Sequence, residues 1–179
     1  MGDAALLLRD FVNTLDVECG ADELGTPAGL AGWLTGRGLL TEGAQASPDE
    51  LALAITLREG LRAALLGHQG ATTGGLPPDL DRALARLPLR VSLAGAVPRL
   101  VPVGGEMAGG LGGLAAAVME CVADGTWTRL KACQEHTCRW AFVDTSKNRS
   151  RAWCSMRVCG NRTKTRAYRA RRRGTPDTA

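Results

Sequence analysis

The sequence predicts an α+β protein in two parts: a mainly helical N-terminal domain with a small β-hairpin, followed by a small cysteine-rich C-terminal unit. Two observations support this prediction. Apolar residues recur at helical spacing through much of the first 125 residues, and four of the six cysteines form two close pairs after residue 130. A chain of 179 residues is long enough for one medium domain and one small one.

Helix start signals divide the N-terminal part. Thr26 and Ser47 each precede a proline, which is the pattern of an N-cap residue and a first helical position. Glu50 completes a capping box with Ser47. Helices are therefore predicted at about 27–35, 48–67 and 78–87, after an apolar segment at 4–15 that fits either a helix or a strand.

The pattern changes after residue 88. Residues 89–93 and 99–103 carry valine and leucine around a turn with Gly95 and Pro98, which predicts a β-hairpin. The glycine-rich residues 104–113 are expected to form a loop before a helix with an apolar stripe that ends near Gly125.

The four late cysteines have the spacing of metal ligands. Four residues separate the members of each pair, and fifteen residues separate the pairs. Two such pairs place four thiolates around one Zn²⁺ ion, through Cys133, Cys138, Cys154 and Cys159. Four protein ligands leave no open position for water, so the site is expected to be structural, and no enzyme is predicted. An iron–sulfur cluster or a redox-sensitive disulfide is the alternative.

A second hairpin is predicted between the two cysteine pairs. Residues 139–144 and 149–153 flank a polar turn at 145–148. A cysteine knuckle, a hairpin and a second cysteine pair at the start of a helix follow one another in the order of a treble-clef zinc finger.

Charge divides the chain in the same place. Residues 1–128 hold eight basic and fifteen acidic residues, a net −7, whereas residues 129–173 hold fourteen basic and two acidic residues, a net +12. Such an asymmetry predicts a polyanionic partner for the basic part.

The basic C-terminal unit contains the candidate nucleic-acid-binding residues. Four arginines recur at helical spacing along one face of a helix after Gly160, and no acidic residue lies between Asp144 and Asp177. A solvated helix face with no partner is the alternative, and Asn161 and Arg151 also suit structural roles. The full set is Lys147, Arg149, Arg151, Asn161, Arg162, Lys164, Arg166, Arg169, Arg171, Arg172 and Arg173.

Several of these residues also match a known family. The segments Trp153-Cys154-Ser155-Met156 and Cys159-Gly160-Asn161-Arg162, with Trp140, Phe142 and Asp144, resemble the CGNR zinc finger. Asp10-Phe11-Val12-Asn13-Thr14-Leu15 and Leu30-Ala31-Gly32-Trp33-Leu34 resemble the ABATE domain that accompanies it. The resemblance covers nearly the whole chain and is loosest between Gly36 and Gly125.

The resemblance implies a stress-responsive transcription regulator. It implies a ligand-binding ABATE-like α+β domain at 1–125 and a treble-clef CGNR finger at 126–173 that binds DNA. We further expect the first domain to mediate dimerisation if it does not sense a ligand, and residues 174–179 to form a disordered tail. The polar residues Asp10, Asn13 and Thr14 are candidates for lining a ligand pocket, and pinning the local segment is their alternative role.

The expected partners follow from these readings. DNA is the leading partner, with a small-molecule effector and a homodimer as further expectations; RNA, or an acidic protein docked by the basic helix, is the alternative. The start of the chain lacks a secretory signal, and no apolar run approaches the roughly 20 residues of a membrane span. We therefore expect a cytoplasmic protein with reduced cysteines and no membrane contact.

Overall fold

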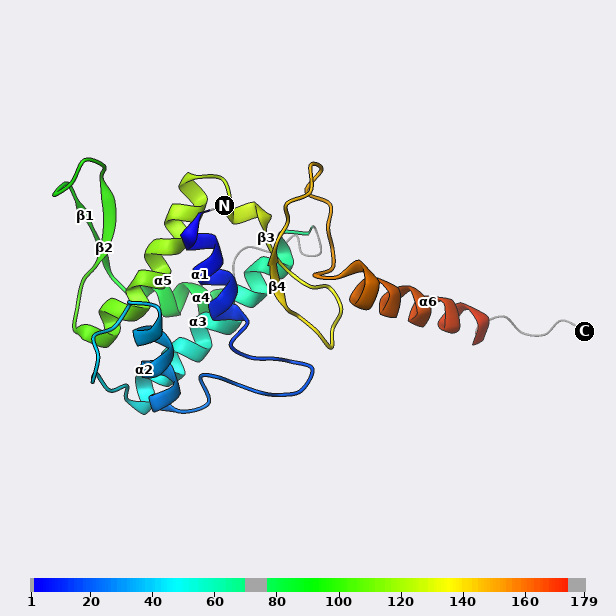
Figure 1. The fold of residues 1–179 in the computed structure, drawn as a ribbon, viewed down its shortest axis with the longest axis horizontal. Coiled ribbons are helices and arrows are strands. Elements are labelled where there is room, and N and C mark those ends of the chain that lie inside the picture. The colour runs from blue at the N-terminus through cyan, green and yellow to red at the C-terminus, as the bar shows by residue number, and fades with distance from the viewer. Residues whose placement is uncertain (1, 70–76, 174–179) are drawn as a thin grey trace, which may run out of the picture.

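The computed structural model describes residues 2–69 and 77–173, so the tail predicted at 174–179 lies outside the described residues. Within the described ranges, six α-helices accompany two separate two-stranded antiparallel sheets (Figure 1). This arrangement confirms the α+β class. The helices α1 to α5 form the main body, and the last helix leaves it on the side that bears the cysteine cluster.

The early helices begin where their capping residues predict. The first is α1 (Asp3–Val12), so the ambiguous first segment is helical. Helix α2 (Pro27–Gly36) is capped by the Thr26 hydroxyl, which accepts a hydrogen bond from the Gly29 amide. Helix α3 (Pro48–Gly67) has the predicted capping box between Ser47 and Glu50. Helix α4 (Pro78–Ala85) is the short helix expected after Pro77.

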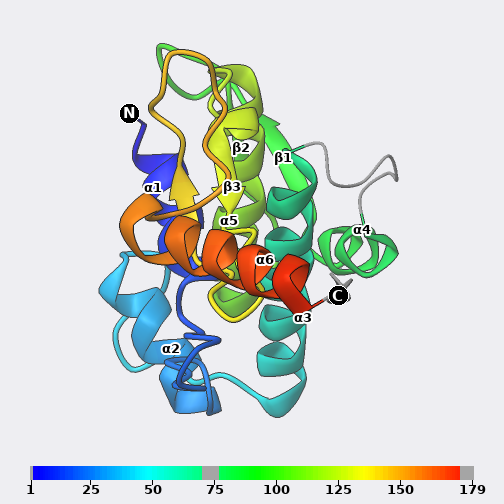
Figure 2. The ribbon, with the colours of Figure 1, turned by 90° about the vertical axis from the view of Figure 1, so that its right-hand side faces the viewer.

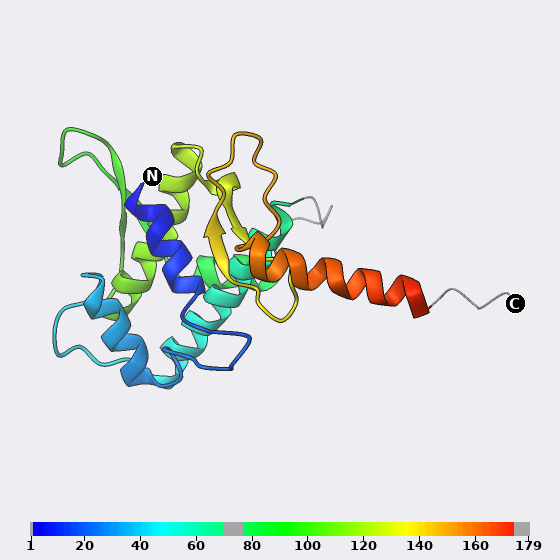
Figure 3. The same ribbon diagram turned by 45° about the vertical axis from the view of Figure 1, so that its right-hand side comes forward.

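The first hairpin also matches its prediction. Strand β1 (Leu89–Ser92) pairs antiparallel with β2 (Arg99–Pro102), and Leu89 lies opposite Pro102. The hairpin protrudes at the end of the molecule farthest from the last helix (Figure 3).

The predicted glycine-rich loop is wrong, because most of it is helical. Helix α5 (Glu106–Ala123) starts within the segment and contains four of its glycines. A Cβ atom on Gly110 would lie 2.9 Å from the Leu39 carbonyl oxygen, and one on Gly112 would lie 2.8 Å from the Pro102 Cβ. These glycines therefore let the helix pack closely against its neighbours, which offsets their low helix propensity.

The second hairpin differs from its prediction. Strand β4 (Ala141–Val143) pairs with β3 (Leu130–Ala132), which precedes the first cysteine pair, and residues 149–153 form no strand. The backbone carbonyls of Arg149 and Arg151 instead accept hydrogen bonds from the Lys131 ammonium group. A buried amine thus replaces a neighbouring strand as the partner of this segment.

The second sheet shares its core with the helices. Leu130, Ala132 and Ala141 are almost completely buried and belong to the same apolar cluster as Phe11 and Leu61. Strand β3 packs against α3, and β4 packs against α1. Residues on both sides of position 125 contribute to one apolar core. The predicted boundary between two domains near residue 125 therefore stays a prediction.

The last helix projects away from this core. A turn of π-helix, η2 (Met156–Gly160), leads into α6 (Asn161–Arg173), which extends beyond the body (Figures 1 and 3). Figure 2 views the molecule from the α6 side and shows the helix lying in front of the body.

Helix α5 is long and apolar enough to cross a membrane by length and composition alone. Half of this helix is buried inside the protein, and it packs against α1 and β2. The core helix of a soluble protein has the same properties, so this observation is weak support for a membrane span.

Candidate metal centre and nucleic-acid interface

The four predicted cysteine ligands lie together. Their sulfur atoms are all within 4.8 Å of one another, and the Cys154 sulfur lies 3.6 Å from that of Cys138 and 3.7 Å from that of Cys159. Zn–S bonds of 2.3 Å in a tetrahedron place sulfurs about 3.8 Å apart. All four cysteines are free thiols, so the cluster fits one tetrahedral Zn²⁺ ion.

The crowding of these thiols also favours a cation. Burial and the neighbouring Cys133 raise the pKa of Cys154 well above its usual range, and burial is the main cause that raises the pKa of Cys159 to about 12. Four thiolates cannot stay ionised this close together unless a positive ion compensates them. Bound Zn²⁺ supplies this compensation and holds the thiolates deprotonated.

Short backbone contacts bring the ligands together. The Cys133 amide donates to the Trp140 carbonyl, and the Cys138 amide donates to the Glu135 carbonyl to close the first knuckle. The knuckle ends at Arg139, whose φ of 54° is in the left-handed region. On the other side, the Arg151 guanidinium donates to the Cys154 carbonyl at 2.7 Å.

A buried ion pair supports the loop that carries Cys154. The Lys131 Nζ lies 2.7 Å from an Asp144 carboxylate oxygen, and both side chains are almost fully buried. Asp144 also accepts hydrogen bonds from the Ser146 hydroxyl and from the Arg151 amide. Burial alone would raise the pKa of Asp144, but hydrogen bonds from Lys131 and Ser146 hold it well below its usual range. The carboxylate therefore orders residues 144–151.

A second buried carboxylate holds the start of α6. Glu135 is fully buried and accepts hydrogen bonds from Arg166 at 2.9 Å and from the Thr163 hydroxyl at 3.0 Å. Burial opposes ionisation of Glu135, yet the contacts with Arg166 and Thr163 lower its pKa to about 2. Arg162 adds bonds to the Thr137 hydroxyl and to the exposed Glu18. These contacts fix the direction in which α6 leaves the body.

The predicted nucleic-acid residues fall into two groups. Arg162 and Arg166 hold α6 to the body, and the Asn161 amide donates to the Arg157 carbonyl. Arg151 supports Cys154 and lies over the Phe142 ring at 5.1 Å.

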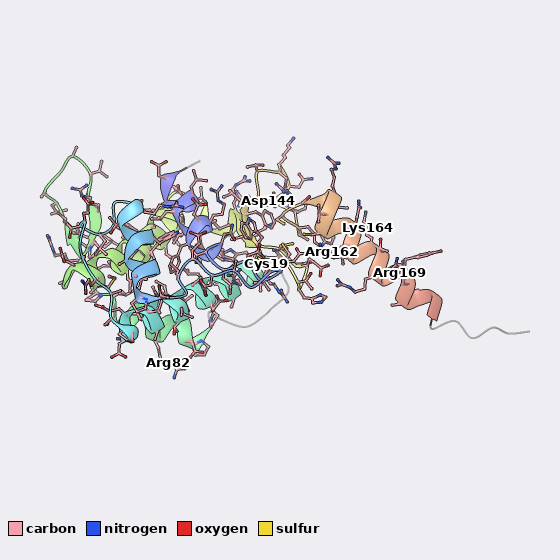
Figure 4. All side chains as sticks on the ribbon, turned by 60° about the horizontal axis from the view of Figure 1, so that its bottom comes forward. Cys19, Arg82, Asp144, Arg162, Lys164 and Arg169 are labelled. Carbon is pink, nitrogen blue, oxygen red and sulfur yellow. The ribbon has the colours of Figure 1, made fainter. Side chains whose placement is uncertain are left out.

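The other group consists of the remaining predicted residues, of which Lys147 and Arg149 on the loop and Lys164, Arg169 and Arg171 on α6 are exposed. Lys164 and Arg169 make no side-chain hydrogen bond or ion pair with the residues that the structure describes, and Figure 4 shows both on the projecting part of α6. Arg171 has a partner within the structure, and Arg172 and Arg173 belong to the last turn of the helix. The assignment of these residues to nucleic acid stays a prediction.

Two of the three candidate pocket residues line a cavity. It has a volume of about 660 Å³ and lies between α1, α2 and the strand β4. Asp10 contributes a carboxylate to its wall, and Asn13 lines it while its amide binds the Ala141 backbone. Thr14 is buried elsewhere, where its hydroxyl donates to the Phe11 carbonyl and accepts from Arg58.

Sequence reasoning missed the buried arginines of α3. Arg58 pairs with Asp22 at 2.6 Å, and Arg62 donates to the Arg139 carbonyl and to the end of α1. The signal was present, because both arginines lie close to the apolar stripe of a helix that must be buried. The anchoring role of Glu135 had a weaker signal: it is one of only two acidic residues in a strongly basic segment.

Comparison with known families agrees with this architecture. Residues 129–172 match the model of the CGNR zinc finger. Residues 5–125 match the ABATE model, which is described as "Putative stress-induced transcription regulator". No curated protein matches the chain. The second match spans well over half of the 179 residues, so the protein belongs to the ABATE family and carries a C-terminal CGNR zinc finger with a structural Cys₄ zinc site.

Proposed function

We propose that the protein is a transcription regulator that binds DNA through α6 and the adjoining loop at 144–151. The observation that carries the proposal is a projecting helix whose charged residues are all cationic and whose residues from Lys164 to Arg171 are all exposed. Thirteen helical residues span about 20 Å, and the major groove of B-DNA, about 12 Å wide, admits one helix.

The two groups of basic residues have different roles in this proposal. Lys164 and Arg169 on the helix, with Lys147 and Arg149 on the loop, neutralise phosphates and supply most of the affinity. Arg162 and Arg166 hold the helix against the knuckle. Zinc keeps the knuckle and the helix start in one rigid unit, as structural zinc does in other small domains.

The N-terminal domain acts as the regulatory part of the protein in this proposal. It binds a small effector or joins two copies, and two copies would double the footprint of a single finger on DNA. The protein works in the cytoplasm and catalyses no reaction. The absence of catalysis is supported by the closed Cys₄ ligand set, which leaves no coordination position for a substrate.

Fluorescence anisotropy with duplex DNA tests the proposal. We expect the zinc-loaded chain to bind a mixed duplex with an affinity that falls steeply with salt. The double variant Lys164→Gln/Arg169→Gln should weaken binding about tenfold or more and flatten the salt slope by about two. The matched control is Arg82→Gln on α4, a basic residue on the main body away from α6 in Figure 4.

A structured RNA competitor separates the alternatives. Binding that resists excess RNA supports the DNA-binding regulator, whereas ready displacement by RNA would contradict it in favour of RNA as the partner. Absence of binding to both nucleic acids at physiological salt would also contradict it and assign α6 to an acidic protein.

A further inference from the structure

The cavity between the N-terminal helices and the zinc finger has walls from both units. Arg9 and Asp10 on α1 and Trp33 on α2 form one side. The other side comes from β4 and from the loop that carries Arg151 and the zinc ligand Cys154. A volume of about 660 Å³ is within the range of small-molecule sites, about 300–1,000 Å³.

Three guanidinium groups face this cavity, from Arg9, Arg37 and Arg151. Arg9 and Arg37 both donate to Asp10, Arg9 through two of its nitrogens and Arg37 through one at 2.7 Å. Each guanidinium has five N–H donors, so most of the donors of this pair remain available. Two arginines that converge on one carboxylate mark a place that already binds an anionic group.

The acidic residues of the cavity do not cancel this preference. Asp10 is compensated by its two arginines, whose hydrogen bonds overcome the effect of burial and lower its pKa. Glu23 is exposed at the rim. Among the Arg, Asp and Glu side chains of the lining, three cations face two carboxylates, a net charge of +1 apart from the zinc-bound Cys154 thiolate.

Aromatic rings complete the lining. Trp33 is mostly buried, with the Arg37 guanidinium 5.0 Å from its ring centre. Trp140 is 37% exposed, which leaves part of its indole accessible, and Phe142 lies beneath Arg151. Indole faces and guanidinium planes both favour flat rings as contacts.

We propose that this cavity binds a small anion that carries a flat aromatic ring, with the anionic group at Arg9 and Arg37 and the ring against Trp140. This inference rests on the regulator function proposed above and identifies the chemical class of its effector. The site lies beside Arg151 and Cys154, so an occupant contacts the finger as well as the sensing domain.

Isothermal titration calorimetry of the full zinc-loaded chain tests this proposal without any nucleic acid. The probes are two aromatic carboxylates, benzoate and indole-3-acetate, and one aromatic phosphate, adenosine monophosphate. Their neutral partners are benzamide, indole-3-acetamide and adenosine. We expect saturable binding of at least one anion. Its neutral partner should bind at least about tenfold more weakly. The carboxylate and phosphate arms show which anionic group the site prefers.

Matched arginine variants locate the site. Arg37→Met should weaken the bound probe about tenfold, whereas Arg82→Met, which also breaks an arginine–aspartate pair but lies on α4, should leave its affinity unchanged. Trp140→Leu is the second variant and should weaken binding through loss of the ring contact. Zinc content and thermal melting confirm that each variant is folded.

Three results would overturn the proposal: no saturable binding of any anionic probe at millimolar concentration, equal binding of the anions and their neutral partners, or unchanged affinity in both folded cavity variants. Failure of the chain to bind DNA would overturn the proposed function and would leave the calorimetric result to decide this site separately.

Discussion

Arg62 on α3 and Arg169 on α6 carry the same side chain in opposite surroundings. Arg62 is 5% exposed and donates hydrogen bonds to the carbonyls of Val12, Leu15 and Arg139. Arg169 is exposed on the projecting helix and makes no side-chain hydrogen bond with the described residues. One guanidinium connects the N-terminal helices to the finger, and the other is available to a partner outside the protein.

The difference shows that positive charge alone does not identify an interface. Four arginines donate hydrogen bonds to acceptors within the protein: Arg58, Arg62, Arg162 and Arg166. A cation whose donors have no internal acceptor can bind phosphate without breaking a contact that stabilises the fold. The same kind of substitution should therefore change the stability of the protein differently in the main body and in α6.

The largest expected effect is the loss of zinc, which would detach α6 from the main body. Cys154→Ser removes one of four ligands, and we expect it to abolish stoichiometric zinc and to lower the free energy of unfolding by about 5 kcal/mol or more. Elemental analysis and chemical denaturation measure both. Cys19→Ser is the control, because Cys19 is exposed and outside the cluster. Full zinc retention in Cys154→Ser would exclude the four-cysteine site.

The next effect concerns the buried pair that orders the finger loop. Asp144→Asn leaves the Lys131 ammonium buried without its counter-charge, which should cost about 3–5 kcal/mol of unfolding free energy at neutral pH. The pKa of Asp144 is lowered by folding, so its contribution is fully present above its ordinary pKa near 3.8 and is lost as the pH falls towards the lower folded value.

Chemical denaturation of both proteins across acidic pH measures this dependence. The difference in stability between wild type and variant should be constant above about pH 5 and shrink below about pH 4. Zinc loss in acid affects both proteins, so the difference isolates Asp144. A difference that grew on acidification would contradict the assigned ion pair.

The smallest effect compares the two arginines directly. Arg62→Met leaves buried carbonyls without donors and should destabilise the chain by about 2–4 kcal/mol. Arg169→Met, the same substitution on α6, should change stability by less than about 0.5 kcal/mol. Urea denaturation measures both. Equal losses in the two variants would mean that α6 contributes to the fold as α3 does.

Much of the fold was predictable because its signals are local. Thr26 and Ser47 fix the starts of α2 and α3 by side-chain caps that any reader of the sequence can recognise. The cysteine spacing likewise predicts the zinc ligands, since each knuckle is a short local turn. The class and the metal centre therefore followed from segments of a few residues.

The remainder depends on contacts between distant segments. The start of α5 was missed because glycine has a low helix propensity. The glycines of this helix allow close packing against Leu39 and Pro102, and this packing cannot be recognised from helix propensity. The partner of β4 was misassigned because the buried Lys131 takes the carbonyls that a strand would need. The anchoring of α6 by Glu135 likewise joins residues about thirty positions apart.

The side chain of Asn13 has a consequence for how the protein behaves at high concentration. Its amide both donates to the Ala141 carbonyl at 3.0 Å and accepts from the Ala141 amide at 2.7 Å, as a neighbouring strand would. The outer edge of β4 therefore has the donor and the acceptor of its first residue occupied by the residue that caps α1. An open strand edge is where chains add to one another and aggregate. The asparagine that caps α1 thus blocks the start of this strand edge to foreign strands.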